Sequence, residues 1–167
     1  MNRIIVLFFL VLLIFDSKAQ TAESFIHIGI SKGEKGDYIG AIADFNKAIV
    51  LDPKFIYAYS NRGVTKEKLG DYRGTIADNN KVIELDPKFV GAYFNRGIAK
   101  EKLGDYKGAI ADYNKAIELD PNFYRVYYNR GIAKFNLGDK NGGCLDWSMA
   151  GELGISEAYY LIREHCN

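Results

Sequence analysis

The chain has 167 residues, a formal net charge of +1 and 26 % charged side chains, and this length suffices for one domain with a substantial core. Without residues 1–19, it keeps 20 of its 22 basic side chains and 20 of its 21 acidic ones, so the charges balance. Lys and Glu alternate along the chain, as on solvated helix faces, whereas nucleic-acid binders carry a basic excess. The composition therefore argues against a nucleic-acid partner.

The N-terminal stretch has the features of a secretory signal peptide. Arg3 precedes an unbroken apolar run, Ile4–Phe15, and small residues follow it. We expect residues 1–19 to be removed by cleavage between Ala19 and Gln20. The apolar run is shorter than the roughly 20 residues of a membrane-spanning helix, so we expect no transmembrane span after cleavage. The sequence thus predicts an exported protein, periplasmic or extracellular.

A repeat organises the rest of the chain. The segment Ala58–Phe89 returns at Ala92–Phe123, 34 residues later, with Asn-Arg-Gly, Leu-Gly-Asp-Tyr and Leu-Asp-Pro in the same order. A fixed period of this length indicates a stacked repeat protein. In this frame, the chain divides into repeats 1 to 4 and a capping helix, at residues 22–55, 56–89, 90–123, 124–155 and 156–167. The fourth repeat is degenerate.

Each repeat has the residues that end one helix and start the next in a helical hairpin. A Gly-Asp pair divides each repeat, with Gly suited to end one helix and Asp to cap the next. The three prolines follow Leu-Asp at one repeat position, where the second helix must end. Gly29, Gly63, Gly97 and Gly131 recur on the first helices, which predicts that the two helices approach closely there. We expect an all-α, right-handed α-solenoid of about four helix pairs plus a C-terminal capping helix.

The pattern resembles the tetratricopeptide repeat (TPR), of the exported bacterial type. An aromatic residue four positions before Gly, then Gly-Asp-Tyr, Ala, aromatic, Ala and Pro recur over 34 residues. The resemblance covers about residues 22–157. It departs from the family where Arg62, Arg96 and Arg130 replace Leu. Asn79 also replaces the second-helix aromatic residue that the other repeats supply as Phe45, Tyr113 and Trp147.

The resemblance implies a concave groove lined by the first helices. An asparagine recurs there, and Asn can bond a peptide backbone both as donor and as acceptor. The predicted groove residues are Ile26, His27, Ile30, Ser60, Asn61, Val64, Phe94, Asn95, Ile98, Tyr128, Asn129 and Ile132, with Glu67, Glu101 and Arg125 at the margins. The other interpretation is that repeat duplication copied an asparagine that only forms hydrogen bonds with neighbouring helices.

These observations predict a non-enzymatic interaction module or scaffold that binds a peptide or protein segment in the groove. The alternative is a structural, self-associating repeat protein of the cell envelope, a homo-oligomer formed through its open N-terminal repeat. The two histidines lie far apart, and no metal-binding or nucleophile motif is present. We therefore expect no catalytic residue, metal or cofactor.

Two further pairings are predicted. Cys144 and Cys166 should form a disulfide bond between antiparallel helices, worth about 3 kcal/mol in the entropic model, with two free thiols as the alternative. The recurring arginines should each pair with an aspartate of the preceding repeat, Asp44, Asp78 or Asp112, because a partly buried Arg needs a carboxylate. An anion-binding row of arginines is the functional alternative.

Overall fold

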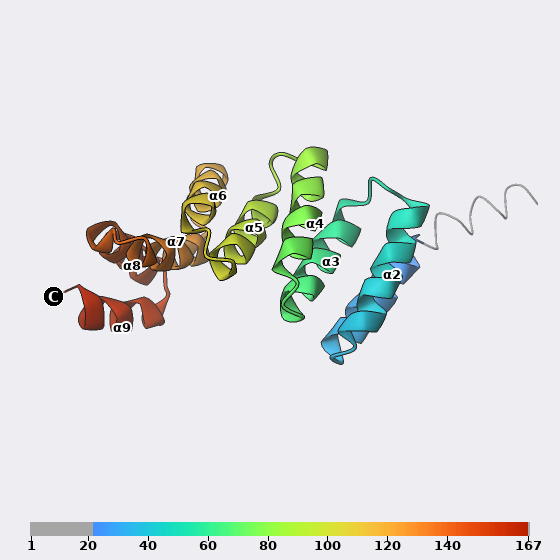
Figure 1. Cartoon of the computed structure of the whole chain (residues 1–167), viewed down its shortest axis with the longest axis horizontal. Coiled ribbons are helices and arrows are strands. Elements are labelled where there is room, and N and C mark those ends of the chain that lie inside the picture. Colours follow the sequence, from blue (N-terminus) through green and yellow to red (C-terminus); the bar gives the residue numbers. More distant parts are fainter. Residues whose placement is uncertain (1–21, 167) are drawn as a thin grey trace, which may run out of the picture.

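The computed structural model describes residues 22–166, so the predicted signal peptide lies outside the described residues. A leading helix covers residues 22–34, and the following elements are α2 (Tyr38–Leu51), α3 (Ile56–Lys68), α4 (Tyr72–Leu85), α5 (Val90–Lys102), α6 (Tyr106–Leu119), α7 (Tyr124–Asn136), α8 (Lys140–Glu152) and α9 (Ser156–His165). Successive antiparallel helices form an elongated array (Figure 1). No helix in the described part is long and apolar enough to cross a membrane. The all-α solenoid class is confirmed.

The turn inside each repeat follows from its Gly-Asp pair. Gly70 has a φ of 77°, in the left-handed region that ends a helix without a steric penalty. Asp71 then caps α4, because its carboxylate accepts a hydrogen bond from the Gly74 N–H at 2.9 Å. The other three repeats have the same turn, built on Gly36-Asp37, Gly104-Asp105 and Gly138-Asp139.

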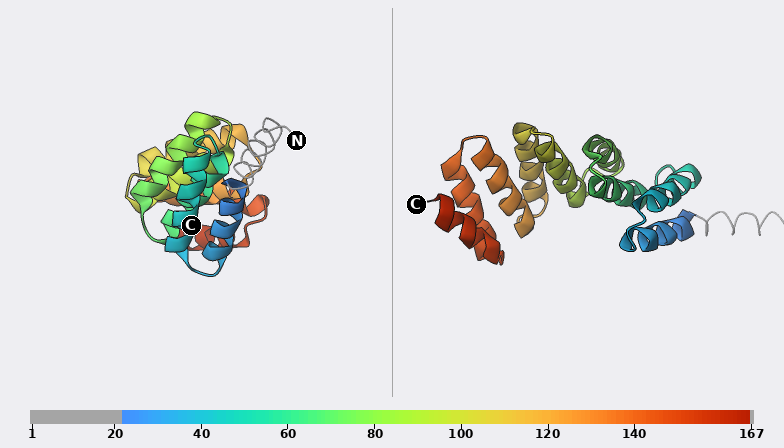
Figure 2. Two further views of the ribbon diagram at one scale, coloured as in Figure 1. Left: turned by 90° about the vertical axis from the view of Figure 1, so that its right-hand side faces the viewer. Right: turned by 60° about the horizontal axis from the view of Figure 1, so that its bottom comes forward.

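The stack is curved, with the first helices on its inner side. The first helices of successive repeats contact one another, α3 with α5 and α5 with α7, in addition to packing on their second helices. No comparable contact joins α4 to α6 in the described part of the chain. The second helices of successive repeats are therefore further apart from one another, on the outer side of the stack. Figure 2 shows the resulting curved array in two further views. Each repeat contacts mainly its neighbours, as expected of a solenoid.

The core between the two helices of a repeat is built on the recurring glycine. A Cβ atom on Gly97 would lie 2.5 Å from the Tyr113 ring, and one on Gly131 would lie 2.5 Å from the Trp147 ring. Tyr113 and Trp147 are almost completely buried. The predicted close approach of the two backbones is seen at Gly131, where the added Cβ would lie 3.0 Å from the Gly143 carbonyl oxygen. In repeats 3 and 4, the glycine also makes room for an aromatic ring on the second helix.

The predicted pairing of each arginine with the preceding repeat's aspartate is wrong. Arg96 donates to Asp112 of its own repeat, at 2.5 and 2.9 Å, and Lys100 adds a contact of 2.8 Å. Arg62 with Asp78 and Arg130 with Asp146 repeat this arrangement. The reason is geometric, because this side of the first helix faces the second helix of the same repeat. The preceding repeat supplies an asparagine instead, as in the 2.7 Å bond from Arg96 to Asn80.

Repeat 1 holds its aspartate differently. Ile28 stands at the arginine position, and Asp44 is bound by Lys32 at 2.5 Å and by Lys47 at 2.9 Å. These hydrogen bonds hold the pKa of Asp44 below its usual value. The buried aspartate is thus satisfied in all four repeats, which argues for a structural role of the row and against an anion site.

The C-terminal end is closed by α9. Ala158 of α9 is fully buried, and it packs in one cluster with Tyr127, Trp147 and Ala150. A disulfide bond joins Cys144 on α8 to Cys166 at the end of α9, with Cα atoms 5.8 Å apart. The structure therefore contains the predicted disulfide bond, and it ties the capping helix to the last repeat.

Candidate functional site: the inner surface of the stack

The inner surface of the stack carries the predicted asparagine row. Asn61, Asn95 and Asn129 are half-buried on α3, α5 and α7. The side-chain amides of Asn61 and Asn129 each donate to a carbonyl one turn earlier, at 2.8 Å. Asn95 makes no side-chain hydrogen bond to another residue among those described. The side-chain oxygens of all three asparagines therefore remain available as hydrogen-bond acceptors for a partner.

A cavity of about 230 Å³ lies between repeats 1 and 2 on this surface. Three of the predicted groove residues, Ile30, Asn61 and Val64, meet in its lining. Phe45 of α2 contributes an aromatic wall, and the missing side chain of Gly33 leaves space on the leading helix. The cavity is therefore mainly apolar, with the Asn61 amide and the charged side chains of Glu34 and Lys68 also in its lining, a combination suited to a buried side chain of a bound peptide.

Two further cavities lie at the other end of the inner surface. One, of about 420 Å³, has mixed polar and apolar walls that include Arg125, Asn129 and Glu157. The other, of about 300 Å³, is lined by Ile132, Phe135, Trp147 and Leu161 among others. Tyr128 lines both, so it lies between the mixed cavity and the apolar one.

The middle of the predicted groove is filled by the protein itself. Phe94 is only 6 % exposed, and its ring packs against Phe123 and Tyr113 with centroids 4.9 and 6.2 Å apart. Ile98 packs against the same core cluster. Ile26, at the N-terminal end, is also 6 % exposed. Phe94 and Ile26 thus belong to the core and offer a partner little surface.

Two charged groups border this middle section: Glu101, and Arg125, whose guanidinium carbon lies 6.0 Å from the Phe94 ring centre. The Tyr113 hydroxyl donates to the Glu101 carboxylate at 3.0 Å, and burial raises the pKa of Glu101 above its ordinary value. Glu67 occupies the same position on α3, one repeat earlier. The inner surface therefore has apolar cavities at its two ends and a carboxylate at its centre.

The remaining predicted residues differ in access. His27 is exposed on the leading helix, and Ser60 is half-buried on α3. Sequence reasoning missed Phe135, Trp147 and Leu161 as cavity walls. Phe135 stands at the repeat position of Glu67 and Glu101, so the repeat frame could have placed it on this surface. Leu161 could not be placed, because α9 lies in a shortened repeat. No group of three or more metal-binding side chains occurs within residues 22–166.

A curved stack of helix pairs with an accessible inner surface defines the class of α-solenoid repeat proteins. A family model described as TPR repeat matches residues 34–70 and 102–138, and a second model, described as tetratricopeptide repeat, matches residues 79–111. These matches together cover more than half of the chain. The protein belongs to the tetratricopeptide repeat family.

Solved structures of this fold resemble the chain along most of its length. A crystal structure of MamA is 24 % identical, covers 88 % of this chain and 86 % of its own, and has a TM-score of 0.77. MamA from Desulfovibrio magneticus RS-1 is 23 % identical, with 79 % and 75 % covered and a TM-score of 0.75. These likenesses show the fold. No curated protein sequence matches the chain.

The first TPR domain of Spaghetti (RPAP3) was solved bound to the HSP90 peptide SRMEEVD. It is 25 % identical to this protein and covers 71 % of this chain and 94 % of its own, with a TM-score of 0.70.

Proposed function

We propose that this protein is a non-enzymatic interaction module that binds a peptide or protein segment along its inner surface. The observation that carries the proposal is the cavity between repeats 1 and 2, where Ile30, Asn61 and Val64 meet. An extended segment could place one apolar side chain there and another beside Ile132 and Phe135. Its backbone could bond the asparagine row between these points. The peptide complex of the RPAP3 domain supports such a role for this fold.

Site-specific photo-crosslinking in the native cell tests this proposal. A photoreactive residue at Val64 or Ile132 should form adducts with a partner, whereas one at Lys107, exposed on the outer side of α6, should not. Asn61→Ala combined with Val64→Ser should abolish the adduct formed from position 132 without changing helix content. Asn141→Ala, at an exposed asparagine of α8, is the matched control. Adducts formed only from position 107 would refute binding at the inner surface.

An exported location, periplasmic or extracellular, is part of the proposal. It is supported by the apolar run Ile4–Phe15 and by the disulfide bond between Cys144 and Cys166, because disulfide bonds persist in oxidising compartments. The mass of the protein isolated from cells should correspond to a chain that starts at Gln20. Thiol-blocking reagents should leave both cysteines unmodified until a reductant is added. Two modified cysteines without reductant would contradict the oxidised state.

A structural role through self-association is the second candidate. It is favoured by the large exposed aliphatic side chains of repeat 1, where Ile39 and Val50 are 77 % and 80 % exposed. Exposed apolar patches on soluble proteins commonly mark contact sites. The two roles use different surfaces, since the first helices line the inner surface and Ile39 and Val50 lie on α2.

A further inference from the structure

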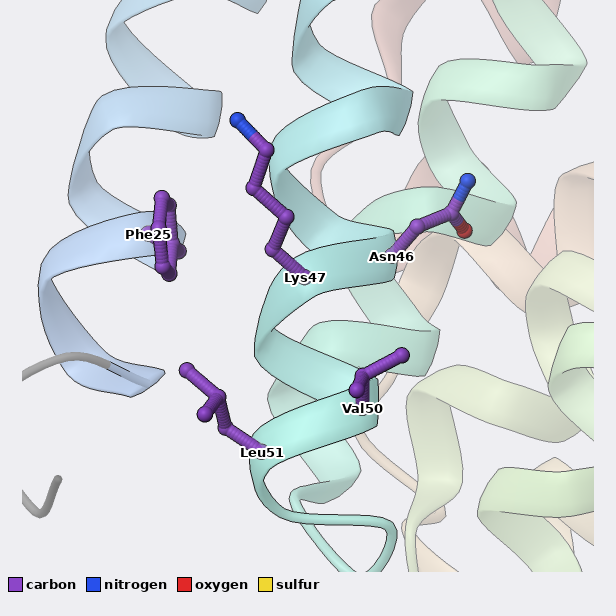
Figure 3. Close-up of a pocket in the computed structure, with 5 residues that line it drawn as sticks. All are labelled: Phe25, Asn46, Lys47, Val50 and Leu51. Carbon is purple, nitrogen blue, oxygen red and sulfur yellow. The ribbon is translucent and has the colours of Figure 1, made fainter.

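The two outermost helices of the described stack are attached in different ways. Figure 3 shows Phe25 on the leading helix opposite Lys47 and Leu51 on α2, and the Lys47 ammonium group lies 5.0 Å from the centre of the Phe25 ring. At the other end of the array, α9 packs on α8 (Figure 1), and the disulfide bond between Cys144 and Cys166 joins these two helices. The chain has only two cysteines, so a thiol reagent can release the C-terminal helix and no other.

Packing holds α9 mainly by its first half. Ala158, in the first turn, is the only fully buried residue of the ten that form this helix. Leu161 and Ile162 are partly buried, and the residues after them, up to His165, are exposed. A helix this short is marginal in water without packing. The disulfide bond at Cys166 therefore fixes the half of α9 that the core holds least.

The disulfide bond borders a hollow at the C-terminal end of the stack. Both cysteines are half-buried and line this hollow of about 640 Å³, together with Lys140 and His165. Lys140 precedes Cys144 by about one helical turn on α8. A nearby cation favours the thiolate form of a cysteine, which makes the Cys144 sulfur a good leaving group. An accessible disulfide bond of this kind exchanges with external thiols more readily than a buried one.

His165 connects this disulfide bond to the inner surface of the stack. It directly precedes Cys166, and it lines both the hollow beside the disulfide bond and the inner cavity of about 300 Å³. The centre of its ring lies 4.9 Å from that of Phe135 and 6.0 Å from that of Trp147. Leu161 of α9 is another wall of the same cavity. The position of α9 therefore decides whether this cavity is complete.

We propose that the disulfide bond is a redox switch: reduction by a dithiol opens the C-terminal half of α9 and removes a wall of the inner cavity. In the oxidised form, His165 stays against Phe135 and Trp147. In the reduced form, the last turns of α9 unfold, and His165 withdraws from both rings. The opening of α9 follows from its packing, whereas the effect on a bound segment rests on the function proposed above.

The exchange needs a dithiol as the reductant. One thiolate of the dithiol attacks the Cys166 sulfur, the bond between the two cysteines breaks, and Cys144 leaves as a thiolate that takes up a proton. The second thiol of the reductant then attacks the mixed disulfide and releases Cys166 as a thiol. The protein gains two electrons and two protons, and the dithiol is oxidised to its own disulfide.

The test compares the oxidised and reduced protein, isolated from cells, by hydrogen exchange and by fluorescence. Trp147 is the only tryptophan of the chain, so its emission reports on this end of the stack. Reduction with dithiothreitol should speed exchange of the α9 amides about a hundredfold, because loop closure no longer favours the closed helix. The Trp147 emission should shift to longer wavelength as its ring gains contact with water. The amides of α3 to α6 should be unaffected, and reoxidation should restore both signals.

Two variants separate the disulfide bond from the ring contact. Cys144→Ala combined with Cys166→Ala should behave as the reduced protein with or without dithiothreitol. His165→Ala keeps both cysteines, so its α9 amides should still respond to reduction. Its Trp147 emission should already be shifted in the oxidised form, because the covering ring is absent.

Three outcomes would overturn the switch. The α9 amides could exchange equally slowly in both redox states, or reduction could speed exchange throughout α3 to α8, which would make the disulfide bond a general stabiliser. Faster α9 exchange with an unchanged Trp147 emission would overturn the link to the inner cavity. None of these measurements uses a ligand, so the crosslinking test of the proposed function is decided separately. Where crosslinking succeeds, the double alanine variant should lower the adduct yield from position 132 more than from position 64.

Discussion

Repeats 2 and 3 are near copies in sequence, yet the space between their helices is filled differently. In repeat 3, the Tyr113 ring lies against Gly97, and its hydroxyl group bonds to Glu101 at 3.0 Å. In repeat 2, Asn79 takes that place. Its amide donates to the Thr75 carbonyl at 2.9 Å, and its buried side-chain oxygen has no partner among the described residues.

The backbone structure of the two repeats is the same despite this difference. The first helices of both repeats have 13 residues and the second helices have 14. Both repeats also have the capped turn and the arginine bridge to the second helix. Turns, caps and ion pairs therefore define the frame of a repeat, whereas the aromatic residue adds local stability. Because solenoid stability is a sum of local terms, repeat 2 should be the weaker of the two.

Copying the repeat 2 residue into repeat 3 should have the largest effect. Tyr113→Asn removes a fully buried ring and leaves a cavity beneath Glu101, and we expect a loss of about 3–5 kcal/mol in the free energy of unfolding. Tyr113→Phe keeps the ring and loses only the hydrogen bond, which should cost about 1 kcal/mol. Denaturant unfolding followed by circular dichroism measures both. Equal losses would show that the hydroxyl group, and not the ring, stabilises this repeat.

Adding a methyl group at the recurring glycine, instead of removing a ring, should also affect the two repeats differently. In Gly97→Ala, the new Cβ would lie 2.5 Å from the buried Tyr113 ring, so we expect a loss of about 1–3 kcal/mol. In Gly63→Ala, the nearest atom is the Asn79 amide nitrogen at 3.3 Å. There the higher helix propensity of Ala should offset the crowding, with a net change within about 1 kcal/mol. Similar losses at both sites would mean that backbone approach, and not the ring, selects glycine.

The sequence alone predicted the frame that both repeats share. The helices start at Ile56, Val90 and Tyr124, where the 34-residue period places them, because local chemistry at Gly, Asp and Pro sets these boundaries. The disulfide bond also followed from the antiparallel order of two helices. Contacts that depend on side-chain direction were harder to predict. The arginine's partner was assigned to the wrong repeat, and Phe94 was placed in the groove although its ring turns into the core.

Removing the unpaired amide should strengthen the weaker repeat. Asn79→Leu keeps a similar volume and replaces a buried polar group that lacks one of its partners. We expect a gain of about 1 kcal/mol in the free energy of unfolding, because the cost of burying the amide oxygen is removed. Hydrogen exchange of the α3 and α4 amides should slow accordingly, while that of α7 and α8 stays unchanged. A loss of stability would indicate that the Asn79 oxygen has a partner, such as a buried water molecule.

The smallest effect should be a pH dependence confined to repeat 3. Burial raises the pKa of Glu101 above its ordinary value of 4.5, so the folded state binds this proton more readily than the unfolded state does. The stability that Glu101 contributes is therefore present below the unfolded pKa and is lost as pH rises through the folded pKa. The glutamine in Glu101→Gln does not titrate. The free energy of unfolding of this variant should therefore rise relative to that of the wild type as pH increases through that interval.

The gain should stay below about 1 kcal/mol, because Glu101 is only half-buried and solvent screens its charge. Glu67→Gln is the matched control in repeat 2, where Asn79 bonds to its own helix and no tyrosine hydroxyl reaches the carboxylate. Unfolding curves at several pH values should converge for Glu101→Gln and the wild type at acidic pH and separate toward neutral pH. If Glu67→Gln produced the same separation, the pH dependence would come from the shared inner surface and not from the buried ring of Tyr113.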